Sequence, residues 1–147
     1  MNQQQQPQPP TDFVNDNNIV CVDEKEVIAV ESIADELVQR MGHHGARVLN
    51  ERELHKVTNV IFTEYPGRRQ RATLEKDLIG KKASEILARA GIASHGDPRL
   101  LVVRVSNGHP LVWTEQMMPI MPVTRVPNAD YAIDLAMQME GGNRRRF

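Results

Sequence analysis

The sequence predicts a layered α/β domain built around a parallel sheet. Short β-branched runs alternate along the chain with helix-like stretches, an order typical of strands joined by helices. Residues 100–105 are apolar except for Arg104, as expected for a strand covered on both faces of a parallel sheet. The 147 residues, 40% of them apolar, can bury one core, which favours a single domain.

The N-terminus is expected to contribute nothing to this core. Residues 1–12 are mostly Gln, Pro and Asn and have no apolar periodicity, which predicts a disordered leader. The domain is therefore expected to span residues 13–147. Two short strand-like runs, residues 19–22 and Val27–Val30, open it.

Two helices are expected after these runs. A capping-box pattern at residues 32–35 opens the first helix, and Gly42 and Gly45 end it. Asn50 is expected to cap the second helix, because its side chain can accept a hydrogen bond from a free backbone N–H. The expected inward-facing residues are Ile33, Leu37 and Met41 in the first helix and Leu54, Val57 and Ile61 in the second.

The middle of the chain is expected to be a loop followed by a helix. Residues 63–80 are polar and contain a Tyr-Pro-Gly turn signal, so they are interpreted as a loop. Residues 81–90 are expected to be helical, with Ile86 and Leu87 facing inward. Gly91 would end this helix in the left-handed conformation.

The C-terminal part is expected to combine interrupted strands with a last helix. Residues 112–113 and 120–126 are interpreted as short extended pieces, interrupted by Pro119 and Pro122 because proline cannot donate to a central ladder. Asn128 is expected to cap the last helix. The expected buried stripe of that helix consists of Ala129, Ala132, Ile133, Ala136 and Met137.

Charge and cysteine content exclude several classes of function. The net charge of -1 provides no global field that would attract nucleic acid or an anionic membrane. A single cysteine cannot form an internal disulfide, and there is no secretory signal, so a reducing, cytoplasmic setting is expected. No apolar stretch approaches the roughly 20 residues that cross a bilayer.

Cys21 is the only cysteine and has two interpretations. Free cysteines are often buried, and the neighbouring Ile19, Val20 and Val22 are strand formers, which favours a core residue. The alternative is a thiolate nucleophile, which requires a lowered pKa or a nearby base. The neighbouring charges are mixed, so spacing leaves both interpretations open.

Glu115 begins a bend rich in Met and Pro, and it also has two interpretations. It could be a solvated loop carboxylate, or a carboxylate that accepts hydrogen bonds from ligand hydroxyls such as those of a sugar. A metal site is not expected. The adjacent His43 and His44 would point about 100° apart on a helix, and with His55 they complete no ligand pattern.

Several motifs in order resemble the CoA-acylating aldehyde dehydrogenases, and in particular the acetaldehyde and propionaldehyde enzymes of ethanolamine and propanediol breakdown. The resemblance runs from about Asp16 to Arg144. It is carried by residues 16–30, by residues 86–92 together with residues 100–105, and above all by the run Gly-His-Pro-Leu-Val-Trp-Thr-Glu-Gln-Met-Met-Pro that begins at Gly108.

The resemblance implies a reaction and a role for both candidate residues. In that family the cysteine matching Cys21 attacks an aldehyde to give a thiohemiacetal, which passes hydride to NAD and becomes a thioester; the thiol of coenzyme A then takes the acyl group. A thiol suits this sequence because the thioester stays activated for a second thiol. In the wider superfamily the glutamate matching Glu115 contacts the nicotinamide ribose. The implied setting is cytoplasmic, or a bacterial microcompartment for full-length members.

The sequence also departs from the family pattern. Only twenty residues precede Cys21, no Gly-rich dinucleotide fingerprint is present, and Arg145 replaces the histidine of a His-Thr-Ala motif. We therefore expect a partial catalytic domain with weak or absent cofactor binding. An uncovered sheet edge would favour self-association or association with a full-length homologue. The alternative to an enzyme is an inactive fragment or an assembly module.

Overall fold

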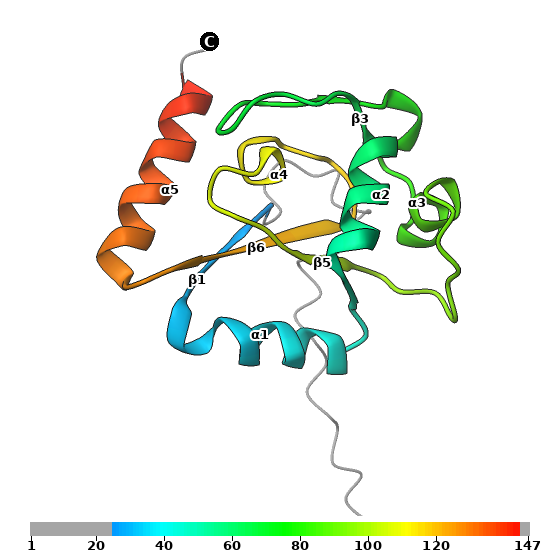
Figure 1. The fold of residues 1–147 in the computed structure, drawn as a ribbon, viewed down its shortest axis with the longest axis horizontal. Coiled ribbons are helices and arrows are strands. Elements are labelled where there is room, and N and C mark those ends of the chain that lie inside the picture. The colour runs from blue at the N-terminus through cyan, green and yellow to red at the C-terminus, as the bar shows by residue number, and fades with distance from the viewer. Residues whose placement is uncertain (1–24, 145–147) are drawn as a thin grey trace, which may run out of the picture.

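A parallel four-stranded sheet forms the centre of the molecule (Figure 1). The computed structural model describes residues 25–144, with side chains to residue 141. The strand order is β1-β6-β5-β2, and each neighbouring pair is parallel. The expected α/β class with a parallel sheet is thereby confirmed. The strands are β1 (Val27–Val30), β2 (Arg47–Leu49), β5 (Leu101–Arg104) and β6 (Ile120–Val126).

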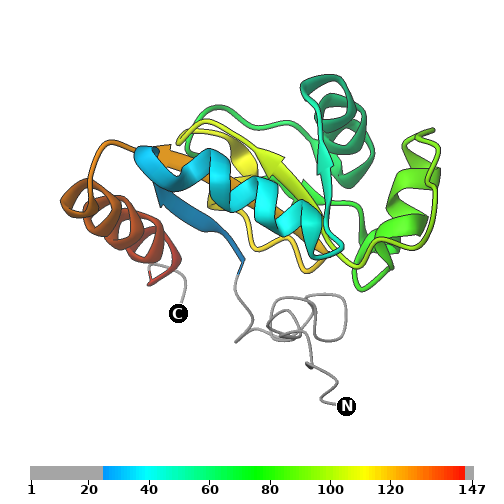
Figure 2. The ribbon, with the colours of Figure 1, turned by 90° about the horizontal axis from the view of Figure 1, so that it is seen from below.

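Helices cover both faces of this sheet (Figure 2). Helix α1 packs on one face against side chains such as Val102 and Met121. The remaining helices lie on the opposite face, where α2 and α3 pack against Leu101 and Val103, and α5 packs against Ile28. The helices are α1 (Glu31–His43), α2 (Glu51–Ile61), α3 (Ala83–Arg89), α4 (Pro110–Trp113) and α5 (Ala129–Arg144).

Helix α1 corrects two expectations. It begins at Glu31 after Val30, with no side-chain cap, so residues 32–35 form no capping box. Ile33 is 54% exposed, whereas Ala34 and Val38 are buried against the sheet. Adjacent helix positions point about 100° apart. The contact with the sheet therefore follows Ala34, and Ile33 faces solvent.

Helices α2 and α3 confirm the local signals that predicted them. The Asn50 side chain accepts from the Glu53 backbone N–H at 2.8 Å, and Glu53 returns the contact to the Asn50 N–H. Val57 and Ile61 are buried. Helix α3 ends before Gly91, whose φ of 70° is the left-handed conformation expected of it.

The region expected to be a loop contains regular structure. Strands β3 (Phe62–Glu64) and β4 (Thr73–Leu74) pair antiparallel with an irregular register, and the 3₁₀ helix η2 (Lys76–Leu78) follows. Strand β2 was also not expected. These elements are two or three residues long, too short to show a periodic apolar pattern.

Two expectations for the C-terminal part were wrong. Residues 112–113 belong to the short helix α4, which His109 caps by accepting from the Leu111 N–H at 3.2 Å and in which Pro110 takes the first position. Residues 120–126 form one continuous strand between β1 and β5, despite Pro122. The donor that replaces the missing proline N–H is described below.

Helix α5 begins as expected but buries a different stripe. The Asn128 side chain accepts from the Tyr131 N–H at 2.9 Å. Leu135 and Met139 are buried, whereas Ile133 is 59% and Met137 67% exposed. The helix packs on β1 and β6 through Leu135 and Met139 together with Ala132 of the expected stripe, whereas Ile133 and Met137 face solvent. Among residues 25–144, no helix is long and apolar enough to span a bilayer.

Candidate functional site: the Glu115 bend

Glu115 lies in the bend between α4 and β6, with its side chain exposed and both neighbours buried. Thr114 is 6% exposed and Gln116 is 0% exposed. The alternation turns the carboxylate outward while the backbone on either side is held in the protein interior. The bend can therefore present Glu115 to a ligand without being mobile itself.

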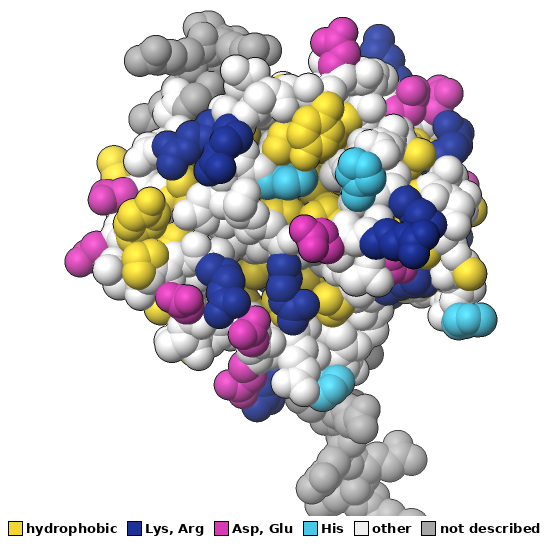
Figure 3. Space-filling model, in the orientation of Figure 1, with side chains coloured by type: hydrophobic (Ala, Val, Ile, Leu, Met, Phe, Trp, Pro, Cys, Tyr) yellow, Lys and Arg dark blue, Asp and Glu magenta, His cyan; other side chains and the backbone are white. Residues whose placement is uncertain are grey.

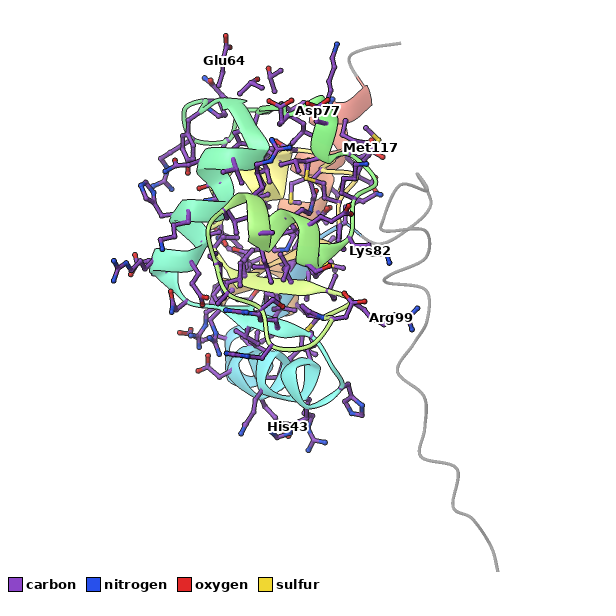
Figure 4. The ribbon with its side chains drawn as sticks, turned by 90° about the vertical axis from the view of Figure 1, so that its right-hand side faces the viewer. His43, Glu64, Asp77, Lys82, Arg99 and Met117 are labelled. Atoms are coloured by element: carbon purple, nitrogen blue, oxygen red, sulfur yellow. The ribbon has the colours of Figure 1, made fainter. Side chains whose placement is uncertain are left out.

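Hydrogen bonds from neighbouring segments fix this backbone. The Ala72 N–H donates to Thr114 Oγ1 at 2.9 Å, which ties the bend to the loop before β4. The Gly80 N–H donates to the Met117 carbonyl at 3.0 Å. Met117 has a φ of 45°, an uncommon value for a residue with a side chain. Figure 4 shows Met117 on the same side of the molecule as Asp77 and Lys82.

Gln116 connects the bend to the beginning of β1. Its Nε2 donates to the Lys25 carbonyl at 2.8 Å and to the Ile120 carbonyl at 2.9 Å. Its Oε1 is a buried side-chain atom without a hydrogen-bond partner among the described residues. One amide group therefore ties the bend to the start of β6 and to Lys25, which lies just before β1.

Acidic side chains gather near the same point. Burial raises the pKa of Glu26, Lys25 opposes this shift, and the negative charges of Glu115 and Glu140 add to it. Because the next residue, Gln116, donates to the Lys25 carbonyl, the bend that carries Glu115 lies beside the start of β1. The corner is acidic, so it suits ligand hydroxyls, which can donate to carboxylates, better than phosphates.

The Gly-His-Pro motif that begins at Gly108, before the bend, is held by the β3–β4 hairpin. The Arg69 N–H donates to the Gly108 carbonyl at 2.9 Å, and Tyr65 Oη lies 3.3 Å from His109 Nε2. Since His109 Nδ1 accepts from Leu111, the neutral ring carries its proton on Nε2 and can donate it to Tyr65. Burial lowers the pKa of His109, which favours this neutral form.

The side chain of Arg69 is held by contacts with Trp113 and Gln138. Its guanidinium carbon lies 5.6 Å from the centre of the Trp113 ring, and its Nη1 donates to Gln138 at 3.1 Å. Trp113 Nε1 in turn donates to the Asn107 carbonyl at 2.8 Å. On this face, basic, acidic, histidine and apolar side chains are interspersed (Figure 3).

The structure describes only one of the two candidate residues that the sequence indicated. Glu115 lies at an exposed, fixed position, whereas Cys21 lies outside the described residues. Its role as nucleophile stays a prediction. His43 is at the end of α1, far from Met117 of the bend (Figure 4). Within residues 25–144, no group of three His, Cys, Asp or Glu side chains is arranged to hold a metal ion. Gln116 was not singled out by sequence, because its contacts depend on the pairing of β1 with β6.

Comparison with known proteins shows similarity to one class of enzymes. No family model matches the chain. Acetaldehyde dehydrogenase (acetylating) EutE of Salmonella typhimurium is 40% identical over 127 residues, which are 86% of this chain and 27% of that enzyme. The chain is thus similar to the CoA-acylating aldehyde dehydrogenases, and it spans about a quarter of the length of its curated relatives.

Solved structures agree with the sequence comparison. Propionaldehyde dehydrogenase of Rhodopseudomonas palustris, with bound propionyl-CoA, superposes with a TM-score of 0.79 at 34% identity, over 91% of this chain and 28% of that one. A second structure of that enzyme contains CoA and an acylated cysteine, with a TM-score of 0.77, 33% identity, and coverage of 88% and 28%. An engineered glycolyl-CoA reductase with bound NADP⁺ has a TM-score of 0.77 at 35% identity, over 90% of this chain and 30% of that one. The chain matches the acetaldehyde and propionaldehyde enzymes as part of a domain.

Proposed function

We propose that this chain carries the acyl-transfer half of the CoA-acylating aldehyde dehydrogenase reaction, with Cys21 as the nucleophile. The observation that carries the proposal is the 40% identity with an acetylating acetaldehyde dehydrogenase over 86% of the chain. The acylated cysteine of the Rhodopseudomonas palustris enzyme supports thioester chemistry in that relative. The whole reaction is that of an oxidoreductase that converts aldehyde, CoA and NAD⁺ to acyl-CoA and NADH.

The chemistry of Cys21 follows from the properties of sulfur. Its thiolate attacks the aldehyde carbonyl carbon, and the resulting oxyanion takes a proton to give a thiohemiacetal. Loss of hydride from that carbon, together with the hydroxyl proton, leaves a thioester on Cys21. NAD⁺, when bound, supplies the hydride acceptor. The CoA thiolate then attacks the thioester carbonyl, acyl-CoA leaves, and the Cys21 thiolate is released.

Glu115 is proposed to accept hydrogen bonds from the hydroxyls of the nicotinamide ribose. Its exposed carboxylate, held on a fixed backbone between two buried residues, supports this role. A pyrophosphate requires backbone N–H groups at a glycine-rich turn before a helix, and the chain contains no such fingerprint. The described residues therefore fit the ribose contact, and the sequence offers no glycine-rich turn for a pyrophosphate.

The chain is therefore expected to carry out only one of the two halves of the reaction. We expect acyl exchange between Cys21 and CoA without efficient hydride transfer, because the cofactor would be held by one contact. NADH formation from NAD⁺, CoA and propanal, measured beside a Cys21→Ala variant, tests the assignment. Equal, background rates in both proteins are expected. A Cys21-dependent signal would overturn it and show that the chain performs both halves.

A second candidate function is an assembly module without catalysis. The edge position of β1 in the four-stranded sheet and the exposed Ile133 and Met137 of α5 favour it. In that case the chain would associate with itself or with a full-length homologue. Co-purification with such a homologue, combined with loss of association in an Ile133→Ser, Met137→Ser variant, would support the module. No complex at micromolar concentration would remove it.

A further inference from the structure

The central strand β6 contains a proline at a position where the sheet needs a donor. Leu101 and Val105 donate their N–H groups to the Pro119 and Val123 carbonyls. The backbone hydrogen-bonding groups of the odd-numbered residues in and just before β6 therefore point toward β5. Pro122 is even-numbered and faces β1. The register pairs Val27 with Val123, so the regular ladder would join an N–H at position 122 to the carbonyl of Lys25. Proline has no N–H to donate.

The side chain of Gln116 supplies that donor. Its Nε2 lies 2.8 Å from the Lys25 carbonyl and 2.9 Å from the Ile120 carbonyl, one acceptor just before β1 and one at the start of β6. Gln116 is completely buried, so water does not compete for these contacts. An amide NH₂ has two hydrogens, which allows it to serve both carbonyls at once.

We propose that Gln116 is a positioning residue that substitutes for the missing backbone N–H of Pro122 and thereby holds the chain at Lys25, beyond which it leads back to Cys21. The same residue follows Glu115, so one buried amide sets the proposed cofactor contact against the strand that follows the proposed nucleophile. This role rests on the proposed function of Cys21. It is independent of whether the chain transfers hydride.

Replacement of Gln116 and Pro122, singly and together, tests the hydrogen-bond substitution. Gln116→Met keeps the length and apolar bulk of the side chain but removes the donor, and is expected to raise amide exchange at residues 27–30 by about tenfold. Pro122→Val restores a backbone N–H that can reach the Lys25 carbonyl. The double variant is therefore expected to recover the protection of the parent. Unchanged exchange in Gln116→Met, or no recovery in the double variant, would overturn the substitution.

The reactivity of Cys21 tests whether the contact positions that residue. Because Cys21 is the only thiol, its alkylation rate by iodoacetamide as a function of pH is a specific readout. The native profile is expected to differ from that of the chain unfolded in urea. Gln116→Met should move it toward the unfolded profile by about threefold in rate, and the double variant should restore it. A Gln116→Met profile identical to the parent would limit the residue to strand pairing and overturn the positioning role.

This design separates failure of the inference from failure of the proposed function. Alkylation and amide exchange require neither CoA nor NAD⁺. If Gln116→Met does not fold alone, the double variant decides, because only the proposed substitution predicts that Pro122→Val rescues it. A chain in which Cys21 is never acylated, yet its alkylation still depends on Gln116, would contradict the proposed function and leave the positioning role standing.

Discussion

The hydroxyl of Thr114 accepts a hydrogen bond from the backbone N–H of Ala72 at 2.9 Å. The two residues belong to segments far apart in the sequence, the bend that carries Glu115 and the hairpin that ends in β4. Because this contact is partly buried, it fixes the direction in which the bend leaves α4. The position of Glu115 is thus determined by residues from the middle of the chain.

Removal of this hydroxyl is expected to destabilise the domain. Thr114→Val keeps the shape of the side chain but leaves the Ala72 N–H without its partner, a loss of about 1–2 kcal/mol in the free energy of unfolding. Urea denaturation measures it. Thr63→Val is the matched control, since its hydroxyl donates to Thr73 at an exposed position and its loss is expected to cost less. Equal losses in both variants would contradict the structural role of Thr114.

His109 is expected to make stability depend on pH in the mildly acidic range. Its pKa is lowered by burial from 6.5, so the unfolded chain binds the proton more readily. The stabilisation is complete above pH 6.5 and is lost as pH falls from 6.5 through the folded pKa. In His109→Gln, the fall in unfolding free energy below pH 6.5 should be shallower. Urea denaturation of both proteins at pH values above and below 6.5 measures the difference.

Glu26 is expected to contribute a pH dependence of stability with the opposite sign to that of His109. Burial raises its pKa above 4.5, so the folded chain holds the proton more tightly, and stability falls as pH rises from 4.5 through the raised folded pKa. Glu26→Gln removes the buried charge and its repulsion with Glu115 and Glu140. A gain of less than about 1 kcal/mol at pH 7 is expected from chemical denaturation. A loss of stability at pH 7, with no change at pH 4, would contradict the assigned environment of Glu26.

The two stripes of α5 are expected to respond differently to substitution. Leu135→Ala removes a buried side chain and should cost about 2–5 kcal/mol of unfolding free energy. Ile133→Ser and Met137→Ser, at exposed positions on the same helix, should each change it by less than about 0.5 kcal/mol. Thermal unfolding compares the three. A large loss in the exposed pair would show that this stripe is covered in solution.

Local signals in the sequence were sufficient for part of the fold. The capping box at Asn50, the left-handed Gly91 and the apolar run of β5 each act within a few residues of themselves, and each was found as expected. The short strands β2, β3 and β4 show no periodic pattern. Residues 120–126 were expected to be extended but interrupted by proline; they form one continuous strand, and the contact of Gln116 with Lys25 that accompanies it exists only after β1 and β6 meet.

The candidate site was partly accessible from sequence for the same reason. The motif around Glu115 marked the bend, but not the contacts from Ala72, Gly80 and Lys25 that hold it. The stripe of α5 was assigned to the wrong side because helical periodicity identifies two apolar faces there without indicating which one meets the sheet. The role of Cys21 still depends on family resemblance and on experiment.

Acyl transfer to Cys21 is the most direct test of the proposed function. The purified chain, incubated with propionyl-CoA alone and quenched in acid, is measured by intact mass and by peptide mapping, beside Cys21→Ser. We expect one propionyl group, on Cys21, in the parent and none in the variant, with loss of the adduct when free CoA is added in excess. An unmodified parent chain, or a propionyl group that persists in Cys21→Ser, would contradict it.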